Sequence, residues 1–316
     1  MALETLHGLE DLARIPGRVH LAIGFFDGVH RGHAAVLDAA RECATRSQSA
    51  LIATTFEPHP LQVLRPQEAP ALLTGLAHKA SLMNQLGVGH LLVLPFSREM
   101  AALSPEAFTD SLVNAGPVLT GITVGEGWAF GRGRSGNVAS LTRLGLQHGF
   151  EVQGVPPVKL MGEPVSSTRV RRAVECGDFA LAAELLGRPW SLQSTVIKGR
   201  QLARKLGFPT ANLETHGLQM PPHGVYAIRA VFHDGRTYSG VANAGHRPTV
   251  DRGSAVHLEA HLFDYTGDCY GGQLELIFHQ RLRGEVRFDS LDELQAQISR
   301  DTAAARRALS SEPLPA

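Results

Sequence analysis

The fold is decided by residues 19–33, which read VHLAIGFFDGVHRGH. A short apolar run is followed by a glycine-rich turn and then by the start of a helical stretch. Buried strands of parallel sheets have this continuous apolar character because both of their faces are covered. Gly24, Gly28 and Gly32 allow a ligand to approach the backbone closely. The stretch therefore predicts a strand, a ligand-binding turn and a helix.

The same alternation continues through the first part of the chain. Further apolar runs occupy residues 51–56, 90–96, 118–124 and 150–155. Helical stretches lie between the runs, at 32–46, 75–87, 104–114 and 137–149. Thr74, Ser104 and Asn137 are good N-cap residues for three of these helices. Strand–helix alternation predicts a doubly wound parallel sheet, in which ligands sit beyond the carboxyl ends of the strands.

The strand–helix alternation stops after two short helical stretches at 168–174 and 178–187. Segments rich in β-branched and aromatic residues follow, separated by turns, at 192–198, 224–232, 237–242, 256–263 and 273–281. This pattern predicts an antiparallel barrel. We expect residues 290–308 to form a terminal amphipathic helix. The fold class is thus α/β with a second, barrel-shaped domain. We expect domains at 1–187 and 188–316.

Charge and composition exclude several classes of function. The 316 residues carry 30 Lys and Arg and 30 Asp and Glu, so the formal net charge is zero. Each of the two expected domains also lies within about two charges of neutral. Nucleic-acid binders and proteins of anionic membranes normally carry a basic excess, so we expect neither partner. With 43% hydrophobic and 19% charged residues, the chain has an ordinary globular balance.

Cysteine usage and the N-terminus bear on location. Cys43, Cys176 and Cys269 are far apart and form no C-x-x-C pair, which argues against a disulfide framework or a structural zinc site. Acidic residues interrupt the N-terminal stretch MALETLHGLEDLARIPG, so it does not resemble a signal peptide. No apolar run approaches the ~20 residues that span a bilayer. We expect a cytoplasmic protein without a membrane partner.

The first candidate site is the turn itself. His30 and His33 are three residues apart and therefore share a face at the start of the predicted helix. Backbone N–H groups at a helix start favour anions, and two imidazoles there can bind phosphate oxygens. A plain glycine turn with two surface histidines is the structural alternative. A metal site is a weaker one, because no third ligand lies nearby.

At this point the chain resembles the H-x-G-H nucleotidyltransferases and, more specifically, the prokaryotic bifunctional riboflavin kinase/FAD synthetase family. After the turn, the resemblance continues in order through TFEPHP (55–60), VGEGWAFG (124–131) with RGRSG (132–136), and VSSTRVR (165–171). It covers nearly the whole chain. The resemblance implies an α/β nucleotidyltransferase domain in which the phosphate of FMN attacks the α-phosphorus of ATP, giving FAD and pyrophosphate.

The resemblance also implies roles for particular residues. His30 and His33 would be catalytic and would contact the ATP phosphates. The implied ATP-binding residues of this domain are Gly24, Phe26, Asp27, Gly28, His30, His33, Ser167, Thr168 and Arg169. The implied flavin-binding residues are Glu57, His59 and Trp128. Taken alone, SSTR could be an N-cap with a surface arginine, and Trp128 could belong to the core rather than stack on a ring.

The chain departs from the family pattern in this domain. Phe25 stands where the family often has Asn, at a variable position. Gly127, Trp128 and Ala129 stand where the family often has Asp-Phe-Arg. Loss of an acid and a base there affects the expected binding of FMN and adenine.

The second candidate site lies in GRQLARKLGFPTAN (199–212). Thr210 offers a hydroxyl oxygen and Asn212 an amide oxygen, both suited to Mg²⁺ that carries phosphates. Pro209 fixes the turn before them. The stretch is not a Walker motif. Without further support, P-T-A-N could be an ordinary turn.

Neighbouring motifs support this site through the same resemblance. GVYA (224–227), GVANAGHRPT (240–249), LEAHLFD (258–264), YG (270–271) and RLRGEVRF (281–288) follow in the order of the riboflavin kinase module. The resemblance implies that Glu259 is the general base for the riboflavin 5′-hydroxyl, although an exposed strand acid is the plain alternative. It assigns Arg283 and Glu285 to the flavin. The implied kinase ATP-binding residues are Gly199, Gly207, Pro209, Thr210 and Asn212.

The resulting prediction is a bifunctional enzyme that makes FMN and then FAD from riboflavin and ATP, with Mg²⁺ as cofactor. Thr210 and Asn212 would be the metal ligands. The family usually has Gly where Ala203 stands, a change that could stiffen or lift the ATP loop. Two alternatives remain: a kinase with a degraded adenylyltransferase domain, or a flavin-binding regulator without turnover. Oligomeric state and passage of FMN between sites stay open.

Overall fold

The computed structural model describes residues 3–198, 209–246 and 256–310 and forms two compact units. The first unit contains residues 1–70 and 79–166, and the second contains residues 71–78 and 167–316. The second unit is therefore built from two separate stretches of sequence. The expected division at 187/188 stays a prediction.

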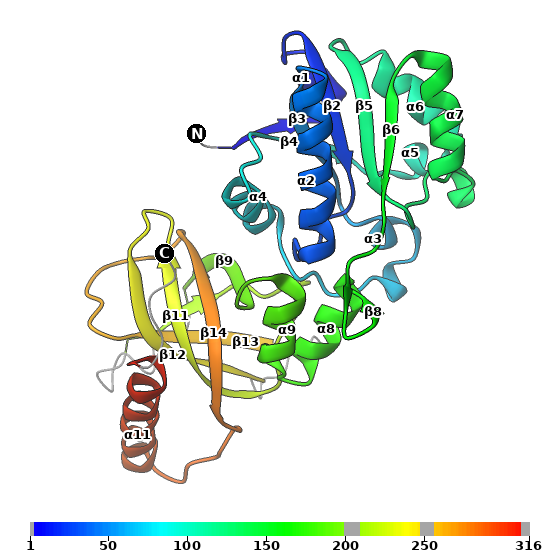
Figure 1. Cartoon of the computed structure of the whole chain (residues 1–316). Coiled ribbons are helices and arrows are strands. Elements are labelled where there is room, and N and C mark those ends of the chain that lie inside the picture. The colour runs from blue at the N-terminus through cyan, green and yellow to red at the C-terminus, as the bar shows by residue number, and fades with distance from the viewer. Residues whose placement is uncertain (1–2, 199–208, 247–255, 311–316) are drawn as a thin grey trace. The chain divides into compact units, whose positions relative to one another are not determined.

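A six-stranded parallel sheet forms the centre of the first unit (Figure 1). Its strands are β1 (Glu4–His7), β2 (Arg18–Ile23), β3 (Ala50–Glu57), β4 (His90–Pro95), β5 (Val118–Gly125) and β6 (Glu151–Val155). They lie in the order β1-β4-β3-β2-β5-β6, and all pairs are parallel. The order changes direction between β2 and β5. The doubly wound parallel sheet is thus confirmed, with β1 as an edge strand that the sequence analysis did not predict.

Helices cover both faces of this sheet. They are α1 (Gly8–Leu12), α2 (Arg31–Arg46), α3 (Pro60–Leu64), α4 (Leu76–Gln85), α5 (Arg98–Ala102), α6 (Pro105–Val113) and α7 (Val138–His148), with 3₁₀ turns at Pro66–Glu68 and Arg132–Arg134. A small hairpin of β7 (Lys159–Leu160) and β8 (Glu163–Pro164) follows. Ser104 and Asn137 cap α6 and α7 as predicted.

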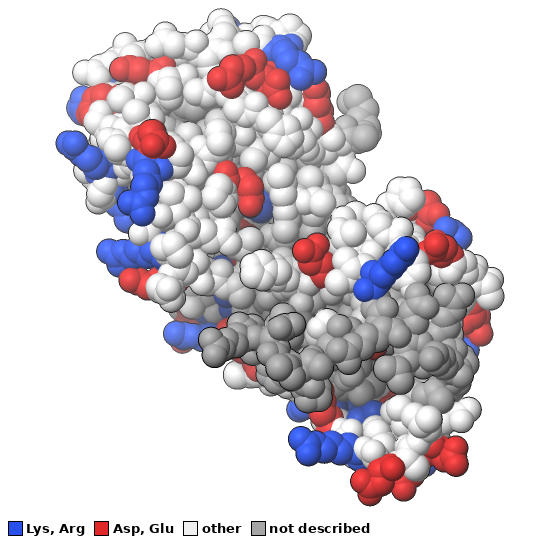
Figure 2. Space-filling view, turned by 180° about the vertical axis from the view of Figure 1, so that it is seen from behind, with Lys and Arg blue, Asp and Glu red and all other residues white. Residues whose placement is uncertain are grey.

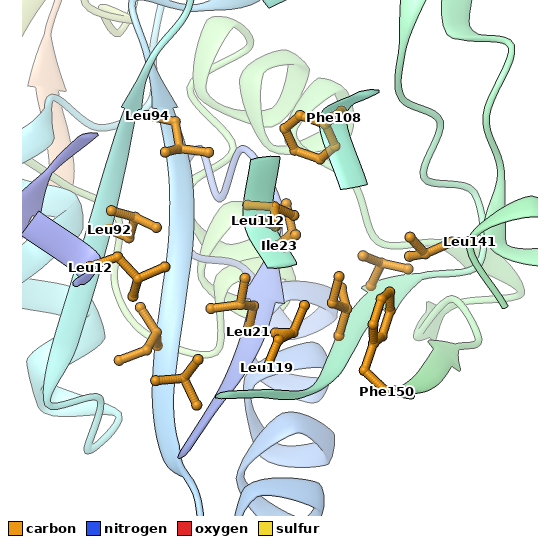
Figure 3. Close-up of a cluster of buried hydrophobic side chains, with 14 of the residues drawn as sticks. Leu12, Leu21, Ile23, Leu92, Leu94, Phe108, Leu112, Leu119, Leu141 and Phe150 are labelled. Atoms are coloured by element: carbon orange, nitrogen blue, oxygen red, sulfur yellow. The ribbon is translucent and has the colours of Figure 1, made fainter. Parts of the chain in front are cut away.

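The core of the first unit lies between the sheet and α1, α6 and α7 (Figure 3). Leu21 and Ile23 of β2 contribute to it because alternate residues of a strand point to one face. Phe108 and Leu112 of α6 cover them. The helix α2 packs on β2 and β5 and contributes nothing to this cluster. The rigid sheet therefore supports the turn that joins β2 to α2.

The second unit contains a closed antiparallel barrel. Its strands are β9 (Ser191–Ile197), β10 (Ala211–Leu213), β11 (Gly224–Phe232), β12 (Thr237–His246), β13 (Val256–Leu262) and β14 (Gln273–Arg283). They close in the order β10-β13-β12-β11-β14-β9. The described part of this unit also includes the helices α8 (Ser167–Glu175), α9 (Phe179–Leu186) and α11 (Leu291–Ser310). The predicted barrel and terminal helix are confirmed, and β10 is an additional strand.

Segment 71–78 belongs to the second unit through specific bonds. The Leu72 N–H donates to the Gly217 carbonyl at 2.8 Å, and the Leu72 carbonyl accepts from the Gln219 N–H at 2.7 Å. His78 Nε2 lies 3.2 Å from Glu275 Oε1. Burial raises the pKa of Glu275, but hydrogen bonds from His78 and Ser191 and the charges of His78 and Arg188 outweigh it and leave that pKa below its usual value. These bonds tie the segment to the barrel.

Charged side chains are mixed in sign over the face that Figure 2 draws. Within the described ranges, the structure has no helix long and apolar enough to cross a membrane.

Candidate functional sites

The turn between β2 and α2 lies at the carboxyl end of β2, where the strand order changes direction. Such a switch point is where ligands bind in open α/β sheets. The turn backbone is unusual, because Phe26, Gly28 and Val29 all have left-handed φ values of 55°, 81° and 42°. Glycine adopts such values readily, whereas a β-branched residue does not. Surrounding structure must hold Phe26 and Val29 in place.

The two histidines of the turn lie against each other. His30 is the N-cap of α2, and its Nδ1 accepts from the backbone N–H of His33 at 3.3 Å. The two rings stack with centroids 3.6 Å apart and planes 12° apart. An ideal Cβ on Gly32 would lie 3.1 Å from the His30 Cε1 atom, so a glycine suits this packing. The structure thus brings the predicted pair together at a helix start, where anions bind.

Behind the turn lies a charged residue that the sequence analysis missed. Lys79 of α4 is 1% exposed, and its Nζ donates to the Phe25 carbonyl at 2.8 Å and to Thr55 Oγ1 at 3.1 Å. Asp27 is also 1% exposed. A signal was present in the sequence: Lys79 shares a helix face with Leu82 and Met83, both buried. A charge on an apolar helix face indicates a buried partner.

The residues expected on the flavin side lie at two places in the first unit. Glu57 ends β3, and His59 caps α3 through its Nδ1, which accepts from the Leu61 N–H at 3.0 Å. The His59 ring meets Phe25 edge-on at 4.2 Å. Trp128 follows β5 and stacks on Phe130, with centroids 4.6 Å apart. One face of the Trp128 indole is therefore covered by the protein.

Ser167 is the first residue of α8, and Thr168 and Arg169 follow it in the first turn. The sequence analysis placed all three at a helix start, and this position is confirmed. Their hydroxyls and guanidinium are the groups expected for a polyphosphate.

In the second unit, a cavity of about 370 Å³ lies beside the barrel. Thr210, Glu259, Arg283 and Glu285 all line it, together with apolar residues of α11 and of the segment before it. The structure thus brings together residues from three separate parts of the sequence, at 210, 259 and 283–285. Asn243, quoted only as part of a motif, lines it as well.

Oxygen-bearing residues lie at paired positions where β10 joins β13. Asn212 of β10 pairs with Glu259 of β13, so their side chains share one side of the sheet. Thr210 precedes Asn212 by two residues and lines the cavity with Glu259. A hydroxyl, an amide and a carboxylate in this arrangement are ligands that Mg²⁺ accepts. The residues present therefore fit that ion.

Arg283 is fixed by an ion pair. Its Nη2 lies 2.7 Å from Asp301 Oδ2, and its Nε donates to both carboxylate oxygens at 3.0 Å. Gln297 Nε2 donates to Asp301 Oδ1 at 2.8 Å. This network joins α11 to β14, and both Arg283 and Asp301 line the cavity. The wall of the cavity thus depends on a residue of the terminal helix.

Thr210 also lines a second cavity, of about 520 Å³. Pro209 and Thr210 line it with Tyr265, Asp268 and Tyr270. Thr210 therefore borders both cavities. Gly199, Gly207 and Ala203 lie outside the described residues.

The parallel sheet with its histidine turn and the barrel with its carboxylate cavity define a two-unit transferase that acts on nucleotides. Family models match accordingly: FAD synthetase over residues 13–169 and riboflavin kinase over residues 186–309. The chain belongs to the family of bifunctional riboflavin kinase/FMN adenylyltransferases.

Relatives in that family match nearly the whole chain. A bifunctional riboflavin kinase/FMN adenylyltransferase of Pseudomonas fluorescens is 41% identical over 304 residues, covering 96% of this chain and 97% of its own. The protein of the same description from Escherichia coli K12 is 38% identical, with the same coverage. A Streptococcus pneumoniae protein described as a macrolide-efflux protein has a similar structure, with a TM-score of 0.80 and 27% identity over 97% of this chain and 99% of that one.

Proposed function

We propose that the chain phosphorylates riboflavin to FMN at the barrel cavity and adenylylates FMN to FAD at the parallel-sheet unit. The observation that carries this proposal is that each unit keeps its own reactive groups. The first unit holds the stacked His30 and His33 at a helix start. The second unit holds Glu259 in a cavity with Thr210 and Arg283.

In the kinase reaction, Glu259 accepts the proton of the riboflavin 5′-hydroxyl while that oxygen forms its bond to the γ-phosphorus of ATP. The bond between the γ-phosphorus and the β–γ bridging oxygen breaks, and ADP leaves with that oxygen. Thr210 and Asn212 hold Mg²⁺, which neutralises phosphate charge when it is bound. Pro209 shapes the turn before Thr210. Arg283 and Glu285, which also line the cavity, contact the flavin.

Adenylyl transfer needs alignment and charge neutralisation rather than a protein nucleophile. An FMN phosphate oxygen forms a bond to the α-phosphorus of ATP, and the bond to the β-phosphate oxygen breaks, releasing pyrophosphate. His30 and His33 contact the ATP phosphates from the α2 start. The family pattern also assigns Ser167, Thr168 and Arg169 to ATP binding, and their hydroxyls and guanidinium at the start of α8 suit a polyphosphate.

The remaining assignments belong to the same proposal. Gly24, Phe26, Asp27 and Gly28 shape the ATP-binding turn. Glu57, His59 and Trp128 contact the flavin. We place the domains at 1–187 and 188–316. A cytoplasmic location fits the three cysteines, all of which are free thiols.

A crossed experiment tests the two activities separately. Riboflavin or FMN is incubated with ATP and Mg²⁺, and FMN and FAD are separated by chromatography. We expect both products from the parent chain. Glu259→Gln should lower FMN formation by about 10²–10⁴-fold while supplied FMN is still converted to FAD. The double variant His30→Ala/His33→Ala should show the reverse pattern.

Other outcomes select the alternatives. FMN without FAD from the parent would indicate a kinase with a degraded second domain, and neither product would indicate a flavin-binding regulator. If Glu259→Gln phosphorylates riboflavin within a few-fold of the parent rate, Glu259 is not the base. Each variant should keep the activity of the unit that carries no substitution, and this activity shows that the protein is not globally unfolded.

A further inference from the structure

Lys79 makes specific contacts with the strand end that leads into the histidine turn. Its Nζ donates to the Phe25 carbonyl at 2.8 Å and to Thr55 Oγ1 at 3.1 Å, and it lies 4.3 Å from the centroid of the Phe25 ring. Thr55 Oγ1 donates to the same Phe25 carbonyl at 2.9 Å. Two donors from β3 and α4 therefore hold one carbonyl of the turn.

The charges around Lys79 explain why an ammonium can be buried there. The acidic groups whose charges act on it are Asp27, in the turn, and Glu57, at the end of β3. Burial lowers the pKa of Lys79 to about 8, and the charges of Asp27 and Glu57 oppose that shift. An unpaired buried charge is strongly unfavourable, so the negative charges of Asp27 and Glu57 help to retain the ammonium.

The turn needs such support. Phe26 and Val29 have left-handed φ values that their side chains disfavour, and His30 follows directly. A turn of this kind keeps its shape only where neighbouring groups hold it. Lys79 cannot contact a substrate, because its side chain is 1% exposed.

We propose that Lys79 is a positioning residue for adenylyl transfer: its ammonium fixes the Phe25 carbonyl and balances Asp27, so that the turn presents His30 and His33 to the ATP phosphates. This inference rests on the proposed function of the first unit. Misplacing catalytic groups by about 1 Å can slow a reaction by about 10²-fold.

The first test is a pair of substitutions. Lys79→Met keeps much of the side-chain length but removes the charge and the donors, and we expect kcat for FAD formation from supplied FMN to fall by about 10²-fold. Lys159→Met is the control, because Lys159 is an exposed lysine of the same unit. FMN formation from riboflavin reports that both variants are folded in the second unit. FAD formation by Lys79→Met within a few-fold of the Lys159→Met rate would overturn the inference.

The second test uses the parent chain and needs no substitution. Because Lys79 loses its proton above about pH 8, kcat for FAD formation should fall as the pH rises through that value. The stability of the first unit should not fall with it. A lysine whose folded pKa is below its unfolded value of 10.5 makes folding more favourable as pH rises from about 8 to 10.5.

This opposite direction separates a positioning role from a merely structural one. We expect the alkaline loss of FAD formation to be absent from Lys79→Arg, since arginine stays charged throughout the range. A parent rate that is flat to pH 9.5, or a loss that follows unfolding measured at the same pH, would overturn the inference. A parent that forms no FAD at any pH would overturn the proposed function of the first unit and this inference together.

Discussion

The ion pair between Arg283 and Asp301 allows a quantitative test of how α11 supports the kinase cavity. Asp301→Asn keeps the shape of the side chain but places an amide N–H₂ where a carboxylate oxygen accepts from the guanidinium. The Asp301 side chain is 8% exposed and that of Arg283 is 21% exposed. Removing one partner of a fully buried pair costs about 3–5 kcal/mol. Since water reaches Arg283 and Asn retains one acceptor, we expect a loss of about 2–3 kcal/mol.

The same helix provides a matched control. Arg306 of α11 pairs with Asp264 at 3.0 Å, but their side chains are 52% and 76% exposed. Exposed pairs contribute about 0.2–1 kcal/mol. Asp264→Asn should therefore destabilise the second unit by less than about 1 kcal/mol. Both substitutions convert an aspartate paired with an arginine into asparagine. The comparison therefore isolates the effect of burial on the stability that the ion pair contributes.

Stability would be measured by urea unfolding, followed by the fluorescence of Trp190. This tryptophan is 2% exposed and packs on Phe179 and Phe278 in the second unit. A Trp128→Phe background removes the other tryptophan of the chain and leaves a probe of one unit. The reasoning is refuted if the free energies of unfolding of the two asparagine variants differ by less than about 1 kcal/mol.

Activity gives a second measure of the same change, without the Trp128→Phe background. Arg283 and Glu259 line the same cavity. Without its ion pair the Arg283 guanidinium is no longer fixed, so riboflavin should bind less well there. We expect kcat/KM for riboflavin to fall by roughly 10-fold in Asp301→Asn, equivalent to losing about 1.4 kcal/mol of transition-state binding. FAD formation from supplied FMN should be unchanged.

Three further predictions concern the first unit and metals. Gly32→Ala places a Cβ about 3.1 Å from the His30 ring, so FAD formation should fall at least several-fold while FMN formation persists; equal rates would show that the stacked pair tolerates displacement. Gly127→Asp should leave FMN binding unchanged or strengthen it, because a side chain at this exposed position meets nothing within 4 Å; FMN titration of both forms decides this, and much weaker binding would contradict it. Dialysis against a zinc chelator under reducing conditions should leave both activities intact once Mg²⁺ is restored, and stoichiometric zinc in the purified protein would count against this.

The sequence analysis predicted the long central strands of the parallel sheet. Central strands of a doubly wound sheet are covered on both faces, so β2 to β5 stand out as apolar runs. Strand β1 is an edge strand of four residues with Leu6 as its buried position, and so short a pattern carries little signal. Strand β10 has three residues and includes the polar Asn212. Its strand character depends on pairing with β13 and β9, which local sequence does not reveal.

For the candidate sites too, only contacts between residues close in sequence could be predicted. The proximity of His30 and His33 follows from their spacing at a helix start, and the structure shows the rings stacked. The partners of Lys79 could not be predicted, because the helix period identifies a buried face but not what lies against it. Arg283 and Asp301 are 18 residues apart, and their pairing depends on how α11 returns to the barrel. Such contacts arise from tertiary structure alone.

The division of the second unit between two stretches of sequence has a consequence for synthesis on the ribosome. His78 contacts Glu275, which is 197 residues further along the chain. At about 5–20 residues per second, His78 is made roughly 10–40 seconds before that partner. During this interval the first unit can form its parallel sheet, whereas segment 71–78 still lacks the strands to which it binds. We therefore expect the nascent chain to be cut by protease within 71–78 until β14 has left the exit tunnel.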